Sequence, residues 1–237
     1  MKVEDQHLKP RRCLYADLPP VEYGEALELQ YRLLAARKEK RIRTDVVLCL
    51  EHPPVFTLGR RGGLENLVVS EAFLEKSGIP VIRAERGGNI TFHGPGQLVG
   101  YPIINLREAR LKVVDYVENL EEVMIRTAGD FGVHAERNPV NRGVWVGNSK
   151  LGSLGVAVRR GISFHGFAFN VNLSLEPFGW INPCGLQGVS VTTVERELSR
   201  EISVAEVRRA VRRHFAAVFM VELEMTGLPE LLLKLDF

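Results

Sequence analysis

The chain has 237 residues, of which 45% are hydrophobic, 25% charged and 8% aromatic. This composition is typical of a globular protein with one sizeable core, and it excludes an intrinsically disordered chain, which would carry far fewer apolar residues. Lys and Arg total 31 against 29 Asp and Glu, a formal net charge of +2, so we do not expect nucleic acid as a partner.

The sequence also gives an expectation about location. It contains no apolar run long enough to span a membrane, and its polar first dozen residues lack the hydrophobic segment of a signal peptide. The three cysteines, Cys13, Cys49 and Cys184, are odd in number and show no C-x-x-C spacing. They indicate neither a disulfide scaffold nor a zinc motif. We therefore expect a cytoplasmic protein with reduced thiols and no membrane partner.

The first half of the sequence predicts helices separated by short apolar strands. Between 21 and 40, Tyr23, Leu27, Tyr31 and Leu34 recur at spacings of four, four and three, which predicts an amphipathic helix with these side chains on its buried stripe. Apolar and β-branched runs predict the strands. The other elements predicted in this half are strands at 13–16, 45–51, 55–58, 81–84 and 101–104 and a short helix at 71–77.

The second half predicts two further long helices and a meander of strands. A helix is expected over 113–131, where apolar residues recur at helical spacing. Two or three strands are expected over 143–172, which is rich in Gly and β-branched residues. Ser203, with Glu206 three residues later, predicts a capping box at the start of the last long helix.

The predicted strands are clustered rather than strictly alternating with helices. This order favours the α+β class, with a mixed β-sheet and flanking helices, over a doubly wound fold. We expect a single domain over residues 12–226, preceded by a polar N-terminal arm, residues 1–11.

The glycine-rich stretch over 86–100 is expected to be a loop that carries chemistry. Its first twelve residues contain four glycines and a proline, and such a backbone turns sharply and lets a ligand approach closely. A purely structural loop is the alternative. The stretch matches neither a Walker A loop nor a dinucleotide-binding motif. Arg86, Thr91 and His93, which a plain turn does not require, favour a binding site.

Three later residues are further candidates. Lys150 stands beside a run of small residues, which suggests close packing against a ligand or a neighbouring strand. His165 is expected to share a strand face with Phe167 and Phe169, which favours a core residue that shapes a pocket. Cys184 lies between Pro and Gly in a loop, where a thiol can be exposed. A thiol of pKa about 8.5 needs a nearby cation to be largely ionised at neutral pH.

These residues leave two interpretations open. Cys184, activated by Lys150 or a histidine, could be the nucleophile of an acyl transferase. Alternatively, His93, His165 and Cys184 could ligate zinc. Because no short ligand spacing supports the metal site, we prefer the nucleophile and expect no metal.

Taken together, these segments resemble the lipoate-protein ligase B family, the octanoyl-ACP:protein N-octanoyltransferases. The resemblance runs from about Leu14 to the helix after Val194. The motifs that carry it are, in order, EHPPVFTLGR at 51–60, RGGNITFHGPGQ at 86–97 with YPI at 101–103, KLGSLG at 150–155, HGFAFN at 165–170 and PCG at 183–185.

The resemblance implies a fold similar to the catalytic domains of biotin protein ligases and lipoate ligases. It implies transfer of an octanoyl group from octanoyl-acyl carrier protein to a specific lysine of lipoyl domains, found in 2-oxoacid dehydrogenase complexes and the glycine-cleavage H protein. Cys184 would carry the group as a thioester, and Lys150 would lower the pKa of its thiol. The acyl-site residues implied are Arg86, Gly87, Gly88, Asn89, Ile90, Thr91, Phe92, His93, Ser153, Leu154, Gly155, Gly166, Phe167 and Ala168.

An acyl thioester is already activated, so this chemistry needs neither ATP nor another cofactor. The rival from another enzyme class is an ATP-dependent lipoate-protein ligase on the same fold, in which Lys150 would contact an acyl-phosphate and Cys184 would be dispensable. A carrier-binding module without catalysis is a more distant alternative.

Basic residues near the proposed site suggest how the donor is recruited. Acyl carrier proteins are typically acidic, so we expect arginines to steer the donor to the site. We also expect a monomer. The arginines in question are Arg60, Arg61, Arg142, Arg159 and Arg160.

Overall fold

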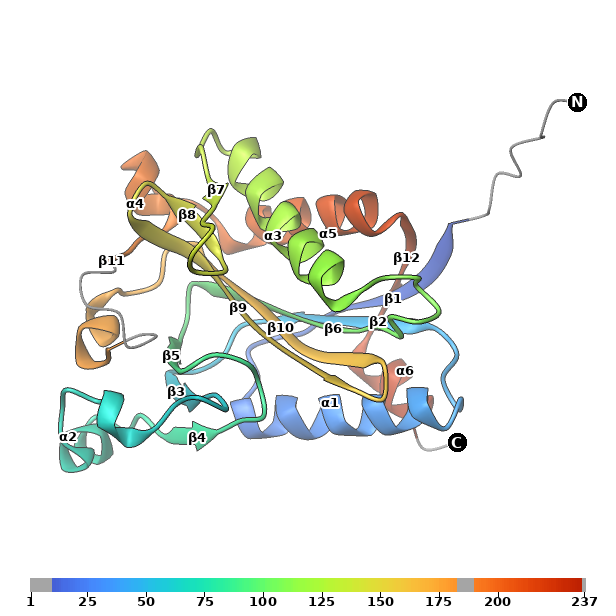
Figure 1. The fold of residues 1–237 in the computed structure, drawn as a ribbon, viewed down its shortest axis with the longest axis horizontal. Helices are drawn as coiled ribbons and strands as arrows, with labels where there is room; N and C mark the ends of the chain where they lie inside the picture. The colour runs from blue at the N-terminus through green and yellow to red at the C-terminus, as the bar shows by residue number, and fades with distance from the viewer. Residues whose placement is uncertain (1–9, 183–189, 236–237) are drawn as a thin grey trace, which may run out of the picture.

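The computed structural model describes residues 10–182 and 190–235, and its main element is a mixed β-sheet (Figure 1). The strands of this sheet are β1 (Arg11–Asp17), β2 (Asp45–Leu50), β6 (Gln97–Ile103), β7 (Glu136–Arg137), β8 (Val144–Val146), β9 (Ser149–Arg159), β10 (Ile162–Asn170), β11 (Ser190–Val191) and β12 (Val221–Thr226). They lie in the order β12-β1-β2-β6-β10-β9-β8-β7, with β11 beside β9. Pairing is parallel for β12-β1-β2 and β9-β11 and antiparallel elsewhere.

Helices cover both faces of the main sheet (Figure 1). The helices that pack on it are α1 (Tyr23–Lys38), α3 (Val113–Asp130), α5 (Val204–Phe219) and α6 (Leu228–Leu233). Successive strand residues point to opposite faces, so Tyr15 and Phe169 join the cluster beneath α3 and α5, whereas Leu48 and Phe164 join the cluster against α1 and α6. The α+β class with a mixed sheet and flanking helices is thus confirmed.

A smaller sheet lies beside the main one. Its strands are β3 (Val55–Leu58), β4 (Val81–Arg83) and β5 (Ile90–His93), in the order β4-β3-β5. Short helices accompany these layers: η1 (Leu64–Asn66), α2 (Glu71–Lys76), η2 (Glu176–Trp180) and α4 (Val194–Leu198). Phe56 and Phe92 form a third hydrophobic cluster, against which Phe178 and Trp180 of η2 pack. This cluster fixes the glycine-rich stretch next to the main sheet.

The loop predicted over 86–100 is only partly a loop. Residues 90–93 form β5, which pairs with β3 in a register that sets Thr91 opposite Thr57, and β6 already begins at Gln97. The pairing partner lies more than 30 positions away in the sequence, so long-range packing overrides the local glycine signal.

The buried stripe of α1 differs from the prediction. Leu27 and Tyr31 are only half-buried, and the buried side chains include Gln30 and Arg37. Arg37 is buried because its Nη2 donates to Asp45 Oδ1 at 2.7 Å, which pairs a charge that periodicity of apolar residues does not reveal. The apolar positions that do face the sheet are Tyr23, Ala26, Leu29, Leu33, Leu34 and Ala36.

The C-terminal part corrects two further expectations. Ser203 is the N-cap of α5, but among the described residues its side chain makes no capping hydrogen bond, so the predicted capping box is wrong; its backbone carbonyl accepts from Glu206 and Val207 instead. Beyond 226, α6 buries Leu231 against α1. The proposed domain limits, 12–226, stay a prediction. No helix in the described ranges is long and apolar enough to cross a membrane.

Candidate active site

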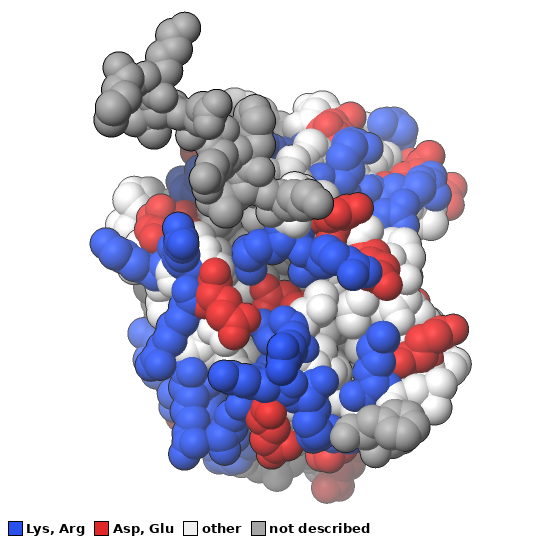
Figure 2. All heavy atoms as spheres, turned by 90° about the vertical axis from the view of Figure 1, so that its right-hand side faces the viewer, with Lys and Arg blue, Asp and Glu red and all other residues white. Residues whose placement is uncertain are grey.

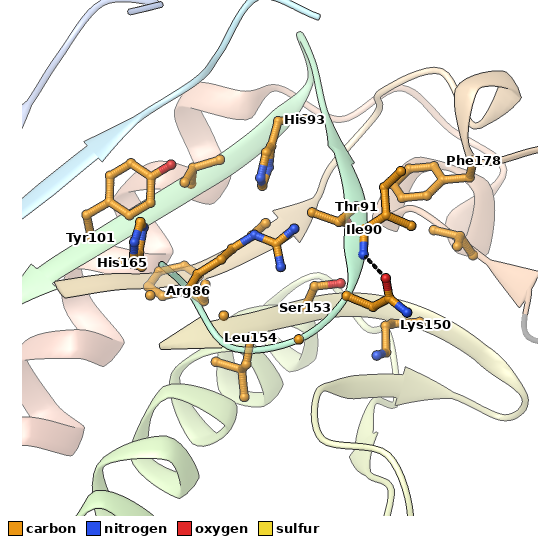
Figure 3. Close-up of a pocket in the computed structure, with 18 of the residues that line it drawn as sticks. Arg86, Ile90, Thr91, His93, Tyr101, Lys150, Ser153, Leu154, His165 and Phe178 are labelled. Atoms are coloured by element: carbon orange, nitrogen blue, oxygen red, sulfur yellow. Dashed lines mark hydrogen bonds between the residues drawn. The ribbon is translucent and has the colours of Figure 1, made fainter. Parts of the chain in front are cut away.

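A cavity lies between the glycine-rich stretch and strands β9 and β10 (Figure 3). Lys150 lines it, and so does Asn141 from the loop before β8. The other residues that the resemblance implies and that line the cavity are Arg86, Gly88, Asn89, Ile90, Thr91, His93, Ser153, Leu154, Gly155, Gly166, Phe167 and Ala168.

The cavity has two ends of different character. The histidine end is formed by side chains that are all buried, and the lysine end by side chains that are half-buried. Figure 3 shows Lys150 and His165 at opposite sides of the lining, with Arg86 between them. The histidine end comprises Tyr23, His93, Tyr101 and His165, and the lysine end comprises Asn141, Lys150 and Val191.

Two implied acyl-site residues lie outside the lining. The ring of Phe92 packs inside the third cluster, with its centroid 5.2 Å from that of Phe56 and 5.8 Å from that of Phe178. The Gly87 N–H donates to Val156 O at 3.1 Å. Both residues hold the glycine-rich stretch in place rather than forming the cavity surface.

Two glycines let neighbouring segments pack closely at the cavity. A Cβ at Gly155 would lie 2.9 Å from Arg86 Cδ, and one at Gly166 would lie 2.1 Å from Gly100 O on the adjacent strand β6. Cβ atoms are not tolerated this close to other heavy atoms, so a larger residue would displace Arg86 in the first case and separate β10 from β6 in the second. Gly155, one of the small residues noted after Lys150, therefore serves close packing of the site.

Arg86 is a buried cation in the middle of the cavity. Only 7% of its surface is exposed. Its Nε and Nη2 donate to Thr57 Oγ1 at 3.0 and 2.8 Å, its Nη2 also donates to Thr57 O at 2.6 Å, and its Nη1 donates to Gly87 O at 3.0 Å. These bonds fix the guanidinium between β3 and the glycine-rich stretch, which positions a fixed positive charge beside any ligand.

Hydrogen bonds and burial keep the histidine end neutral. His52 donates from Nδ1 to Val21 O at 2.6 Å, so its Nε2 accepts from the Tyr101 hydroxyl at 2.7 Å. Burial lowers the pKa of His52 to about 4. Burial, followed by the neighbouring His52 and Arg86, holds the pKa of His93 well below its usual value. Burial also raises the pKa of Tyr23 to about 12.

A chain of hydrogen bonds links the histidine end to the lysine strand. His93 donates from Nδ1 to Gln97 Oε1 at 2.7 Å, and Gln97 Nε2 donates to Asn170 Oδ1 at 2.9 Å. Asn170 Nδ2 donates to Thr192 O at 3.0 Å, while the Thr192 N–H donates to Lys150 O at 3.0 Å. Gln97, Asn170 and Thr192 are buried. The backbone at Lys150 is thus tied to the same network that orients His93.

His165 lies differently from its predicted position. Its φ is +54°, and its N–H donates to Gln30 Oε1 at 2.8 Å. The centroid of its ring lies 4.8 Å from that of the Phe164 ring. The predicted alternation is therefore broken, and His165 does not share a face with Phe167 and Phe169, which pack on the α3 and α5 side. Neither ring nitrogen has a hydrogen-bond partner among the described residues. Burial lowers the pKa of His165 to about 3, so the neutral ring acts as a wall.

Lys150 stands at the start of β9, where β11 pairs with it in parallel and sets Val191 opposite it. Its Nζ donates to Asn141 Oδ1 at 3.2 Å and lies 4.9 Å from the centroid of the Trp145 ring. Both contacts are of the kind that an ammonium group makes. The side chain is half-buried, so its charge is accessible from the cavity.

Cys184 lies outside the described residues, so the structure does not test the nucleophile or the trio of His93, His165 and Cys184 that could ligate zinc. Within the described ranges, no group of three or more His, Cys, Asp or Glu side chains could hold a metal. His93 already uses Nδ1 for Gln97, and its Nε2 lies 3.4 Å from Thr57 Oγ1. Cys13 and Cys49 are both buried.

Several residues that line or support the cavity were not predicted from the sequence. Tyr23, Tyr101 and Asn141 line the cavity, and Thr57 and His52 hold lining residues from behind. In the sequence, Tyr23 is one member of an amphipathic helix stripe. Its position at the start of the helix is the one signal that could have identified it as a lining residue. Asn141 comes from a loop with no recognisable motif, and its role depends on a contact with Lys150 that only the fold creates.

The sequence relatives decide the family. A family model described as the lipoyl protein ligase A/B catalytic domain matches residues 22–216. An octanoyltransferase from Desulfotalea psychrophila is 50% identical over 205 residues, which is 86% of this chain and 92% of the relative. An octanoyltransferase from Syntrophobacter fumaroxidans is 45% identical over 221 residues, or 93% of this chain and 96% of the relative. The chain belongs to the lipoyl protein ligase A/B family.

Solved structures of lipoate ligases agree with this chain on the fold. A bi-partite lipoate protein ligase from Thermoplasma acidophilum superposes with a TM-score of 0.73 at 18% identity, covering 96% of this chain and 91% of that one. A lipoate-protein ligase A bound with ATP gives a TM-score of 0.74 at 18% identity, covering 95% and 92%. At this identity the likeness concerns the fold, and it confirms the expected lipoate-ligase architecture.

Proposed function

We propose that this member of the lipoyl protein ligase A/B family is an octanoyltransferase that moves an octanoyl group from octanoyl-acyl carrier protein to a specific lysine of a lipoyl domain. The observation that carries the proposal is the identity of 45 to 50% with octanoyltransferases over most of both chains. The cavity supports it, because it joins a buried, neutral end to an end with a lysine.

The proposed placement of the substrate follows the character of the two ends. An eight-carbon tail suits the histidine end, where His93 and His165 are neutral and buried and Phe167 and Ala168 add apolar surface. The thioester carbonyl then lies towards Lys150.

Cys184 is the proposed nucleophile. The described residues on both sides of its segment support this: Phe178 before it and Val191 after it both line the cavity, and Val191 pairs with Lys150. A cation beside a thiol favours the thiolate. In this arrangement Lys150 stabilises the ionised Cys184.

Two half-reactions follow. The Cys184 thiolate attacks the octanoyl carbonyl, a new C–S bond forms, the bond to the carrier sulfur breaks, and the Lys150 ammonium protonates the departing carrier thiolate. The neutral amine of the lipoyl-domain lysine then attacks the octanoyl-enzyme and passes one proton to the neutral Lys150. The amide forms as the Cys184 thiolate leaves, which restores the ion pair. Arg86 and backbone N–H groups stabilise charge and orientation during both steps.

The donor docks beside Arg60 and Arg61 in this proposal. Both are exposed, their backbone N–H groups donate to the carbonyls of Arg86 and Gly88 at the cavity, and neither side chain forms an ion pair with a described residue. The other expected steering residues are partly engaged. Arg142 pairs with Glu118 and Glu121, and Arg159 pairs with Glu85. Figure 2 shows a second gathering of Lys and Arg at the end of the molecule that carries the start of β1.

The proposed function also includes the acceptors, the location and the oligomeric state of the enzyme. The acceptors are lipoyl domains of 2-oxoacid dehydrogenase complexes and the glycine-cleavage H protein, and the enzyme acts as a cytoplasmic monomer over a catalytic domain of residues 12–226. The alternative is an ATP-dependent ligase, for which Lys150 would contact an acyl-phosphate. The solved lipoate ligase structures share about 18% identity with this chain, so they support the ligase alternative less than the octanoyltransferases support the transferase.

The test supplies the two reactions separately. Purified protein is mixed with a lipoyl domain and either octanoyl-acyl carrier protein without ATP or free octanoate with ATP, and octanoylation is measured by mass spectrometry. We expect modification from the carrier without ATP. Modification only from free octanoate with ATP would instead assign the ligase reaction, and modification under neither condition would refute both.

A further inference from the structure

The lysine of the cavity is enclosed by a short loop, residues 138–143, between β7 and β8. The Lys150 Nζ donates to Asn141 Oδ1 at 3.2 Å and faces the Trp145 ring at 4.9 Å. A Cβ at Gly143 would lie 3.1 Å from Lys150 Cε and 2.6 Å from Gly152 O, and its φ is +133°. Only glycine lets the loop pass this close to the lysine.

The loop holds Asn141 in one position. Its N–H donates to Asn138 Oδ1 at 3.0 Å, and its carbonyl accepts from Trp145 Nε1 at 3.0 Å. Two residues further on, the Gly143 N–H donates to Glu121 Oε1 of α3 at 3.0 Å, and the Glu121 side chain is 1% exposed. These hydrogen bonds therefore fix the main chain that carries the side-chain amide of Asn141.

The orientation of the amide is set by Lys150. An ammonium only donates hydrogen bonds, so Asn141 turns Oδ1 rather than Nδ2 towards it. This leaves Nδ2 buried without a hydrogen-bond partner among the described residues. A buried N–H without a partner lowers stability, and an apolar side chain would avoid that loss. What the asparagine supplies in return is the contact with Lys150.

We propose that Asn141 is a positioning residue that aims the Lys150 Nζ at the reacting thioester. The proposal rests on the octanoyl transfer proposed above. In it, Lys150 gives a proton to the carrier sulfur and takes one from the incoming amine, and both transfers need Nζ within hydrogen-bond reach of the reacting atoms. Asn141 acts through Lys150.

The charged groups around Lys150 bear on any test that varies pH. From α3, Glu121 faces the loop and is paired with Arg142 and Arg137. Beside β11, Glu197 accepts from the Thr192 hydroxyl at 2.5 Å, and Arg86 lies across the cavity. These groups are unchanged in the variants below, so they shift the profile of every variant equally.

The experiment measures single-turnover discharge of octanoyl-enzyme by a lipoyl domain as a function of pH. Asn141→Ala is expected to slow discharge about 10- to 100-fold, with little change in the domain concentration that gives half the maximal rate. Asn141→Asp puts a carboxylate beside Nζ, which favours the ammonium, so the rising limb of the profile moves up by about 1 pH unit or more.

Asn148→Asp is the matched control, because it adds the same charge two positions from Lys150 on an exposed turn. Its profile is expected to superimpose on that of the wild type. The proposal is overturned if Asn141→Asp also superimposes, or if folded Asn141→Ala discharges at the wild-type rate. Thermal melts establish folding, and Asn141→Ser replaces the alanine variant if that does not fold. A wild type that forms no octanoyl-enzyme would instead overturn the proposed function and this inference together.

Discussion

The histidine end and the lysine end belong to one cavity but differ in charge: the side chains of the first are neutral, whereas the second carries the ammonium of Lys150. At the histidine end, burial lowers the pKa of His165 to about 3, and behind this end burial lowers the pKa of His52 to about 4, so both rings are neutral at physiological pH. At the lysine end, a half-buried Lys150 faces an aromatic ring and an amide oxygen, which favour a cation. Titratable residue types therefore build an uncharged wall in one place and a charged one in the other.

This difference shows that residue type alone does not tell what a side chain does. Three histidines near a cavity suggest acid–base chemistry or a metal, yet burial holds the rings of His52 and His93 neutral and each ring already uses Nδ1 for a hydrogen bond within the fold. The lysine keeps its chemistry because the loop before β8 leaves it accessible to the cavity.

The largest effect is expected at the lysine end. Lys150→Met removes the cation that stabilises the thiolate and the group that moves the proton, so the transfer rate should fall by about 1,000-fold or more. The melting temperature should change little because Lys150 is half-buried. Steady-state transfer to a lipoyl domain measures the rate, with Lys76→Met, an exposed lysine of α2, as the control. A Lys150→Met enzyme within tenfold of wild type would contradict the assignment.

The buried neutral histidines at and behind the histidine end are expected to make the free energy of unfolding depend on pH. Histidines whose folded-state pKa is lowered bind no proton where the unfolded chain, with pKa about 6.5, binds one, so stability present above pH 6.5 is lost as pH falls towards 4. Each such histidine costs about 1.4 kcal/mol per pH unit in this window, or about 2 kcal/mol at pH 5. Urea unfolding at pH 7 and pH 5 measures the loss.

A pair of variants assigns that loss to the cavity. His165→Asn keeps a residue that tolerates the positive φ and removes one titration, so the slope should decrease by about 1.4 kcal/mol per pH unit. His134→Asn, at an exposed position, should leave the slope as it is. Equal slopes for the wild type and His165→Asn would mean that the ring is not held neutral by burial.

Arg86 lies between the two ends of the cavity, and its position is expected to depend on the hydroxyl of Thr57. Thr57→Val keeps the shape of the side chain but removes the hydroxyl that accepts from Arg86 and lies 3.4 Å from His93 Nε2. Buried donors on Arg86 lose an acceptor, so the free energy of unfolding should fall by about 1–2 kcal/mol. Thr57→Ser retains the hydroxyl and should recover most of the loss. If valine and serine cost the same, packing rather than hydrogen bonding holds Arg86.

The smallest effect concerns the approach to the cavity. Reversing the charge of Arg60 and Arg61 together should raise the KM for octanoyl-acyl carrier protein severalfold at low salt, and the difference should shrink as salt screens the charges. Arg43→Glu, between α1 and β2 at the other basic end of the molecule, should have no such effect. The docking proposal is wrong if both reversals act alike or if salt makes no difference.

The sequence predicts much of this molecule where the signal is local. Strands such as 45–51 and helices such as 113–131 carry strong periodicity, and the glycine-rich stretch and Lys150 converge on one cavity as their motifs suggest. Elements that depend on distant partners are missed. β5 owes its existence to pairing with β3, and the buried charge of Arg37 depends on Asp45 from another strand.

The site follows the same division. Residues within the motifs were predictable, whereas Asn141 and Thr57 act through contacts that the tertiary fold creates. The positive φ of His165 is a further case, because it moves the ring to the α1 side of the sheet against the alternation of its own strand. A period-two pattern cannot reveal such a local break.

The central claim is that an octanoyl group passes through Cys184, and intact mass measures this most directly. The protein is mixed with octanoyl-acyl carrier protein without ATP, beside a Cys184→Ser control. The account predicts that the wild type gains one octanoyl group, that the control gains none, and that a lipoyl domain removes it. An adduct on the serine control, or transfer to the lipoyl domain at an undiminished rate by that control, would contradict the account.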